Sequence, residues 1–170
     1  MSNRPQRQKT AKRRPGATLK DAERRRLAAN SRTQRGDQPK LYVAWCDGGV
    51  RGDQAAAAFV LSSPTGRVIA EEARIVGGRT IEEVECLAVA AALEQAAELQ
   101  LDELEVRLDS QVVVGWLLED PRPPASARPL RPVIKQLARF ARVSFRWVPR
   151  EENARADGLV WAAITDATRP

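Results

Sequence analysis

The sequence predicts an α/β protein built on one mixed sheet of five strands flanked by helices. The first observation behind this prediction is the order of the hydrophobic patterns. Three strand-like segments come first, and helical and strand-like segments alternate after them. The second is that short turns join the first three strands, which makes those strands antiparallel. The third is that helical segments precede the later strands, as parallel crossovers require.

The chain is expected to divide into a basic tail (1–40), one domain (41–166) and a frayed C-terminus (167–170). Residues 1–38 carry 12 Lys and Arg against 3 Asp and Glu, a charge of +9, whereas residues 39–170 carry 16 against 19, a charge of −3. The tail is poor in apolar residues, so we expect it to be disordered. Such a basic block is typical either of an arm that binds nucleic-acid phosphates or of a solubilising segment.

The first strand is predicted over residues 41–46, and Asp47 with the pair Gly48-Gly49 is expected to end it. A charge at the end of such an apolar strand needs a partner or a ligand. An Asx-type turn is the alternative interpretation, because Asp-Gly is also a common turn sequence. The next two strands are predicted over residues 55–61 and 67–76.

The rest of the domain alternates between helix and strand. Thr80-Ile81-Glu82-Glu83 is a capping box, so a helix is predicted to begin there and to continue to about Gln100. Residues 119–129 contain four prolines and are predicted to form an irregular loop. The other predicted elements are the strands 102–108 and 143–148 and the helices 110–118, 130–141 and 153–164.

Histidine is absent from the sequence, which excludes Ser-His-Asp and Cys-His catalysis and the usual zinc sites. Cys46 and Cys86 stand in separate apolar segments and are expected to be reduced and buried. No run reaches the roughly 18 apolar residues of a membrane span, and the N-terminus lacks the apolar core of a signal peptide. We therefore expect a cytoplasmic protein with no membrane contact, whose chemistry belongs to carboxylates.

Four acidic residues lie where solubility does not explain them. Asp47 and Asp109 follow apolar strands, and Glu85 lies one turn into the long helix. Asp157 shares the apolar face of the last helix with Trp161. Ligands of open α/β sheets bind at the carboxyl ends of strands, so Asp47 and Asp109 are expected to converge if their strands are neighbours.

These carboxylates predict a metal site. Like charges at close range need protons or cations to neutralise them, and oxygen ligands select a hard cation such as Mg²⁺ or Mn²⁺. Two such ions about 3.5–4 Å apart are the arrangement for in-line phosphodiester hydrolysis. Other acidic residues have simpler interpretations, because Glu83 belongs to the capping box and Glu151 and Glu152 stand at a helix N-terminus.

Four segments containing these residues come in an order and at a spacing that resemble a known family. They are Asp47-Gly48-Gly49-Val50-Arg51-Gly52, Glu83-Val84-Glu85-Cys86-Leu87-Ala88, Leu108-Asp109-Ser110-Gln111-Val112-Val113 and Trp147-Val148-Pro149-Arg150-Glu151-Glu152-Asn153-Ala154-Arg155-Ala156-Asp157. The family is ribonuclease HI, in particular its histidine-lacking, reverse-transcriptase-associated branch. The resemblance covers about residues 41–166.

The resemblance implies the ribonuclease H-like fold and a monomer that hydrolyses the RNA strand of RNA–DNA hybrids. It implies two Mg²⁺ ions, with Mn²⁺ as a substitute, both bridged by Asp47. Asp157 would help hold the ion that activates the attacking water. Glu85 and Asp109 would hold the ion that stabilises the departing 3′-oxygen. The implied nucleic-acid contacts are Gly48, Ser110, Gln111 and Asn153, with Arg122, Arg128 and Arg131 as substitutes for a lysine-containing phosphate-binding segment that this chain lacks.

The chain departs from the family pattern after Asp47. Residues 53–58 replace an Asn-Pro-Gly and further glycines, so contacts with RNA 2′-hydroxyls are expected to differ. A non-catalytic hybrid-binding protein on the same fold is therefore one alternative, which the basic tail also favours. A fragment of a sugar-kinase or actin-like ATPase is another, but that fold needs two such domains. The four intact carboxylates favour the nuclease.

The four tryptophans divide into two groups. Trp45, Trp147 and Trp161 stand in predicted strands or on an apolar helix face and are expected in the core. Trp116 precedes the proline-rich loop. We expect it to be partly exposed and a candidate contact with nucleic acid.

Overall fold

A computed structural model describes residues 41–77, 79–118 and 127–169 of the chain. These residues belong to one compact unit, residues 39–170. The predictions for the tail and for most of the proline-rich loop, including Arg122, lie outside the described residues. Within them, no helix is long and apolar enough to cross a membrane.

The five predicted strands form one mixed sheet in the order β3-β2-β1-β4-β5. The first three pair antiparallel, while β4 pairs parallel with both β1 and β5, which confirms the predicted fold class. Because β1 lies at the centre, it touches both the antiparallel and the parallel half. The strands are β1 (Tyr42–Arg51), β2 (Gln54–Ser62), β3 (Val68–Ile75), β4 (Glu103–Leu108) and β5 (Arg142–Trp147).

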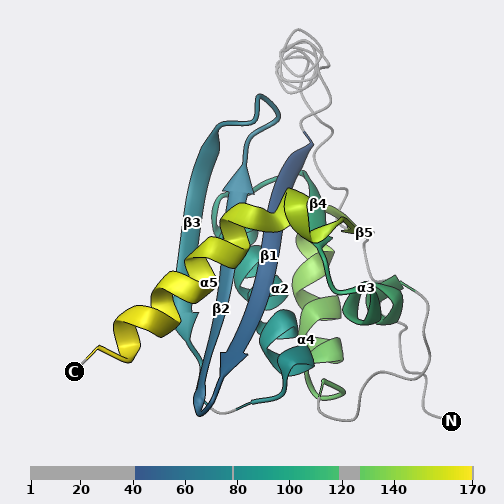
Figure 1. The fold of residues 1–170 in the computed structure, drawn as a ribbon. Coiled ribbons are helices and arrows are strands. Elements are labelled where there is room, and N and C mark those ends of the chain that lie inside the picture. Colours follow the sequence, from purple (N-terminus) through teal and green to yellow (C-terminus); the bar gives the residue numbers. More distant parts are fainter. Residues whose placement is uncertain (1–40, 78, 119–126, 170) are drawn as a thin grey trace, which may run out of the picture. The chain divides into compact units, whose positions relative to one another are not determined.

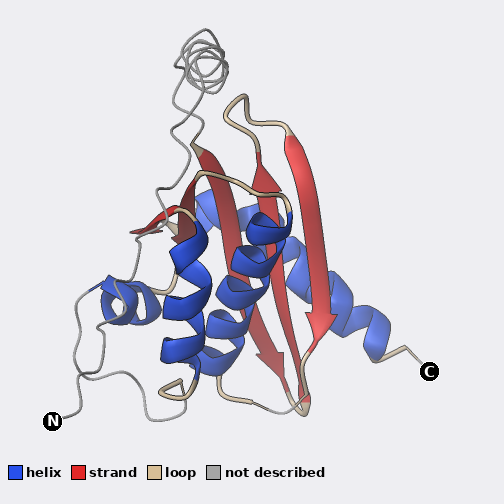
Figure 2. Ribbon diagram, turned by 180° about the vertical axis from the view of Figure 1, so that it is seen from behind, coloured by secondary structure: helices blue, strands red, loops and turns tan. Residues whose placement is uncertain are grey.

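Helices cover both faces of this sheet. In Figure 1, α5 crosses the front of β1, β2 and β3, and α2 and α4 lie behind the sheet. Figure 2 shows the reverse side, with α2 and α4 in front of the strands. The helices are α2 (Ile81–Glu98), α3 (Gln111–Leu118), α4 (Leu130–Leu137) and α5 (Ala154–Ala167), with the 3₁₀ turns η1 (Ala138–Phe140) and η2 (Arg150–Asn153).

Helix α2 begins as predicted, because both hydrogen bonds of the capping box between Thr80 and Glu83 are present. Its inner face is rich in buried alanines, which let the helix approach the sheet closely. The main core lies between α2, α3, α4 and the sheet, and it contains Cys46 and Cys86 as buried free thiols, as expected.

The prediction that Asp47 and the glycine pair end the first strand is wrong. Strand β1 continues to Arg51, and a two-residue turn at Gly52 and Asp53 then leads into β2. Gly52 has a φ of 57°, which suits such a hairpin turn. Asp47 therefore lies inside a strand, and the Asx-turn interpretation does not apply.

Gly48 and Gly49 serve close packing instead. A Cβ atom on Gly48 would lie 2.6 Å from the backbone nitrogen of Glu85, and one on Gly49 would lie 2.4 Å from Cγ1 of Val160. The glycine pair thus lets α2 approach one face of β1 and α5 approach the other. Because the contact at Gly48 is with backbone, it sets the position of the first turns of α2.

The tryptophans correct the sequence interpretation in two places. Trp116 is fully buried rather than partly exposed, because it shares the inner face of α3 with Val113. Trp147 is 42% exposed rather than buried, and it ends β5, the edge strand. Trp45 and Trp161 are half-buried.

Candidate active site

Asp47, Glu85 and Asp109 come together at one place in the fold. One carboxylate oxygen from each lies within 4.8 Å of the other two. Asp47 and Asp109 meet because β1 and β4 are parallel neighbours. The last pair in their register is Trp45 with Arg107, and each aspartate stands two residues beyond it. The predicted convergence of Asp47 and Asp109 is confirmed, but only Asp109 follows the end of its strand, since Asp47 lies inside β1 just beyond its last pair with β4.

Glu85 reaches the cluster from α2. Its backbone nitrogen lies against Gly48, directly after Asp47 in β1, so the close helix–strand approach places the two side chains together. Glu85 is buried, and its Oε2 has no hydrogen-bond partner among the described residues. A buried carboxylate oxygen without a donor is costly unless a proton or a cation satisfies it.

Protons can neutralise two of the three carboxylates. Burial, followed by the charges of Asp109 and Asp157, raises the pKa of Asp47 to about 7. Burial, followed by the charges of Asp47 and Asp109, raises the pKa of Glu85 to about 9. Near neutral pH the metal-free site therefore holds a proton on Glu85 and is close to the titration point of Asp47.

Asp157 lies beside this cluster but does not belong to it. Its charge raises the pKa of Asp47, which places it within electrostatic range. Its Oδ1 accepts a hydrogen bond from Arg150, which also forms an ion pair with it, and another from Nε1 of Trp161 at 3.1 Å. The structure thus brings three of the four predicted carboxylates together and gives the fourth two donors of its own.

Asp109 is held from two sides. Nδ2 of Asn153 donates to Oδ1 of Asp109 at 3.3 Å and to the backbone oxygen of Cys46 at 2.9 Å. Nε1 of Trp147 donates to the backbone oxygen of Asp109 at 3.0 Å. Asn153 is buried, so in this structure its amide ties β1 to β4 next to the carboxylates.

The other residues predicted to contact nucleic acid differ in their exposure to solvent. Ser110 accepts a hydrogen bond from the backbone nitrogen of Val113 at 3.3 Å, which satisfies a donor in the first turn of α3. Gln111 and Arg128 are exposed, whereas Gly48 is buried against α2. Nε of Arg131 is buried and has no partner among the described residues.

Sequence reasoning missed Arg150, Trp147 and Trp161 as parts of the site. Arg150 and Trp147 stand within the last family-like segment, so their position in that motif was an available signal. Trp161 stands four residues after Asp157, and that spacing alone places the two side chains on one helix face. The interpretation of this face as apolar concealed the hydrogen bond.

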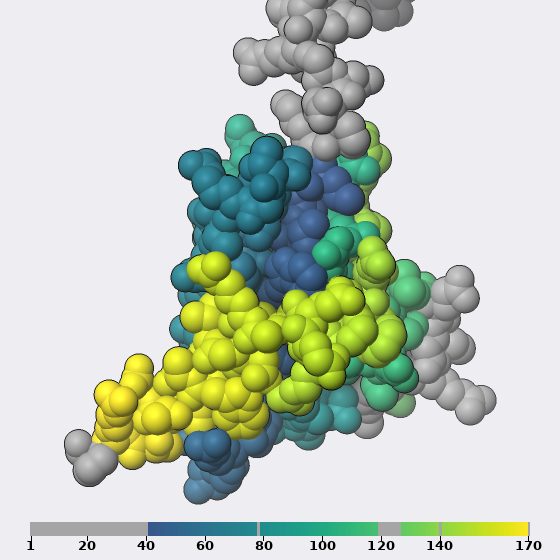
Figure 3. Space-filling model, turned by 45° about the horizontal axis from the view of Figure 1, so that its top comes forward, coloured from purple at the N-terminus to yellow at the C-terminus, as the bar shows by residue number. Residues whose placement is uncertain are grey.

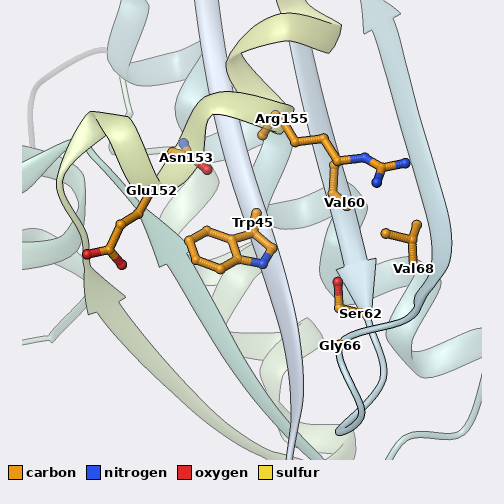
Figure 4. Close-up of a pocket in the computed structure, with 9 residues that line it drawn as sticks. Trp45, Val60, Ser62, Gly66, Val68, Glu152, Asn153 and Arg155 are labelled. Carbon is orange, nitrogen blue, oxygen red and sulfur yellow. The ribbon is translucent and has the colours of Figure 1, made fainter.

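A hollow of about 200 Å³ lies next to the start of α5. Figure 4 shows Trp45, Val60, Ser62 and Val68 on the strands and Glu152, Asn153 and Arg155 at the start of α5 and in the turn before it. In the space-filling view of Figure 3, α5 and the residues before it lie across the strands. Because Asn153 lines the hollow and also donates to Asp109, the hollow borders the acidic site.

The sheet order has one acidic residue inside the central strand, one directly after its parallel neighbour and one on the helix packed against them. This arrangement defines a protein of the ribonuclease H-like class. A family model described as reverse transcriptase-like matches residues 46–163. The chain belongs to the ribonuclease HI, or ribonuclease H-like, family.

Individual relatives support this assignment. The chain is 38% identical over 134 residues to a ribonuclease HI of Halobacterium salinarum, and the match covers 73% of this chain and 64% of that protein. The crystal structure of RNase H1 from that archaeon is 36% identical with a TM-score of 0.69, over 74% of this chain and 98% of the other. LC11-RNase H1, solved in complex with an RNA/DNA hybrid, is 28% identical with a TM-score of 0.68, over 75% and 99%.

Proposed function

We propose that this protein is a metal-dependent endonuclease that hydrolyses the RNA strand of RNA–DNA hybrids by a two-metal-ion mechanism. The observation that carries the proposal is the cluster of Asp47, Glu85 and Asp109, with three carboxylate oxygens within 4.8 Å of one another. The relative solved in complex with an RNA/DNA hybrid supports the substrate class.

Mg²⁺ is the proposed cofactor, two ions with substrate bound, and Mn²⁺ is the proposed substitute. The donor set fits a hard divalent cation, because it consists of carboxylates and includes the unpartnered Oε2 of Glu85. Asp47, Glu85 and Asp109 would hold such ions, and Asp157 would contribute to the second. When bound, the ions supply activation of the attacking water and stabilisation of the departing 3′-oxygen.

The residues of the chain prepare this site in two ways. Asn153 and Trp147 fix Asp109 through its carboxylate and its backbone oxygen, as outer hydrogen bonds commonly orient metal ligands. Glu85 and Asp47 hold protons that must leave when a cation enters, because their pKa values are about 9 and about 7. Metal binding is therefore expected to strengthen as pH rises.

The proposal extends to the finer assignments. The absence of histidine from the sequence supports assignment to the histidine-lacking branch of the family. The exposed Gln111 and Arg128 are proposed to contact the hybrid, together with Ser110 and the +9 tail. We also propose a tail of residues 1–40, a domain of residues 41–166, a monomeric state and a cytoplasmic location.

The test is cleavage of a hybrid labelled on its RNA strand, incubated with Mg²⁺ or Mn²⁺ beside DNA–DNA and RNA–RNA duplexes. Cleavage only of the hybrid, only with a divalent ion, and lost in Asp109→Asn, is the expected result. Binding of the hybrid without cleavage would instead assign a non-catalytic binding protein. One observation favours this second candidate. The chain turns tightly at Gly52 and Asp53, and residues 53–58 contain no glycine that would let the backbone approach the RNA strand closely.

A further inference from the structure

Two donors converge on a single oxygen of Asp157. Arg150, in the turn η2, and Trp161, one helical turn after Asp157, both bind Oδ1. The side chain of Asp157 is only 23% exposed, so these donors face a partly desolvated carboxylate. Its charge nevertheless acts on Asp47. Asp157 thus stands at the border of the acidic cluster with its own donors in place.

Contacts from β1 fix the ring of Trp161. The guanidinium of Arg51, beside the hairpin turn, lies over the indole at 5.0 Å from the ring centroid. On the strand itself, a Cβ atom on Gly49 would lie 3.7 Å from Cη2 of Trp161. Because the ring is held in this way, its N–H has a defined direction, and the carboxylate of Asp157 is oriented by it.

Arg150 is the more exposed of the two partners. Its side chain is 64% exposed, and an ion pair to so exposed a group is weak. Its charge also lowers the pKa values of Asp47 and Glu85, although burial outweighs that effect. In the metal-free protein, Arg150 therefore acts on the carboxylates as a bound cation would, and it can leave at little cost.

We propose that Arg150 is the counter-ion of Asp157 in the metal-free protein and competes there with a divalent cation. A phosphate group of the hybrid attracts Arg150 away and frees Asp157, while Trp161 remains as the positioning residue that keeps Asp157 directed at the cluster. Binding of the second cation thereby depends on binding of the substrate. This inference rests on the proposed function, since it assigns Asp157 to the second ion.

The first experiment measures Mn²⁺ binding by calorimetry in the absence of nucleic acid. Arg150→Gln should bind Mn²⁺ about tenfold more tightly than the natural protein, because the competing charge is gone. Arg155→Gln is the matched control. Arg155 also lies at the start of α5, is 59% exposed and pairs with a carboxylate, Glu71, so its loss should change the affinity less than twofold.

Trp161→Phe keeps the ring and removes only the donor, so it should weaken Mn²⁺ binding about threefold, opposite in sign to Arg150→Gln. If Arg150 and Trp161 only supported the local structure, both variants would bind Mn²⁺ more weakly than the natural protein. Unchanged or weaker Mn²⁺ binding by Arg150→Gln would overturn the proposal.

The second experiment follows the indole N–H resonances by ¹H–¹⁵N NMR with EDTA present, and Trp161→Phe assigns the resonance of Trp161. Addition of an RNA–DNA hybrid should shift this resonance toward its position in free Arg150→Gln. That variant should also show a salt slope of hybrid binding smaller by about 0.9, the loss of one phosphate contact. A resonance that stays in place would contradict the release of Arg150. Neither experiment needs turnover, so a failure of cleavage and a failure of this inference are separate results.

Discussion

Replacement of Glu85 by Gln should stabilise the metal-free protein, and the gain should grow with pH. Glu85 has a pKa of about 9 in the folded protein against 4.5 for the free side chain. Below pH 4.5 both the folded and the unfolded states hold the proton. Between pH 4.5 and 9 only the folded state holds it, so the free energy of unfolding falls by about 1.4 kcal/mol for each pH unit.

The expected magnitude follows from this window. At pH 7 the natural protein has lost about 3 kcal/mol of stability through Glu85 relative to pH 4.5, as the slope of about 1.4 kcal/mol per unit gives. Gln has no proton to lose, so this pH-dependent loss of stability is absent from the variant. The variant should therefore be nearly equal to the natural protein at pH 5 and about 3 kcal/mol more stable at pH 7.

Urea unfolding in EDTA at pH 5, 7 and 9 measures this difference. Glu94→Gln is the control, because Glu94 is exposed on the same helix and should change stability by less than about 0.5 kcal/mol. Added Mn²⁺ should reverse the order at pH 8, since only the natural protein can offer the Glu85 carboxylate. Parallel curves for the natural protein and Glu85→Gln, or a gap that narrows as pH rises, would refute this electrostatic account.

Three further predictions concern the chemistry, the packing and the tail. Asp109→Asn should abolish metal-dependent cleavage and leave the metal-free Tm unchanged or raised, because it removes a charge that raises the pKa values of Asp47 and Glu85; cleavage at the natural rate, or an unfolded variant, would exclude Asp109 as a ligand. Gly48→Ala should cost about 1–3 kcal/mol in urea unfolding and reduce cleavage, because the new methyl group meets the backbone of α2; a loss of less than 0.5 kcal/mol would show that the helix shifts freely. Removal of residues 1–38 should raise KM and leave kcat within about threefold, because it removes phosphate contacts that are independent of sequence. The slope of log KM against log salt concentration should become smaller by about 3. Equal KM values and equal salt slopes for the two proteins would show that the tail serves another role.

The fold could be predicted because its signals are local and agree with one another. Periodicity gave the strands and helices in order, and the capping box at Thr80 placed the start of α2 within a residue. The convergence of Asp47 and Asp109 followed from a single topological assumption, that the first and fourth strands are parallel neighbours.

The errors arose where a residue's environment depends on distant parts of the chain. Gly48 and Gly49 have the sequence of a turn, but glycine is needed there because α2 and α5 pack closely on opposite faces of β1. Trp147 has the pattern of a core residue, yet it ends an edge strand. No local pattern indicates which helices will cover a given face.

The arrangement around Asp157 could be predicted only in part. Its place on the face of α5 shared with Trp161 followed from helical spacing, and the hydrogen bond between them confirms that the two side chains meet. The ion pair with Arg150 joins residues seven apart across the junction of η2 and α5. Because regular helical spacing does not extend through that junction, the sequence offered no measure of this distance.

Analysis of the reaction products on a hybrid labelled at either strand shows whether bound metal ions cleave its RNA strand. Hydrolysis by carboxylate-bound ions predicts cleavage of the RNA strand alone, with 3′-hydroxyl and 5′-phosphate ends, only when Mg²⁺ or Mn²⁺ is present, and none in Asp109→Asn. Cleavage in EDTA, 2′,3′-cyclic phosphate ends, or cutting of the DNA strand would contradict the assignment of Asp47, Glu85 and Asp109 as the centre of a metal-dependent hybrid nuclease.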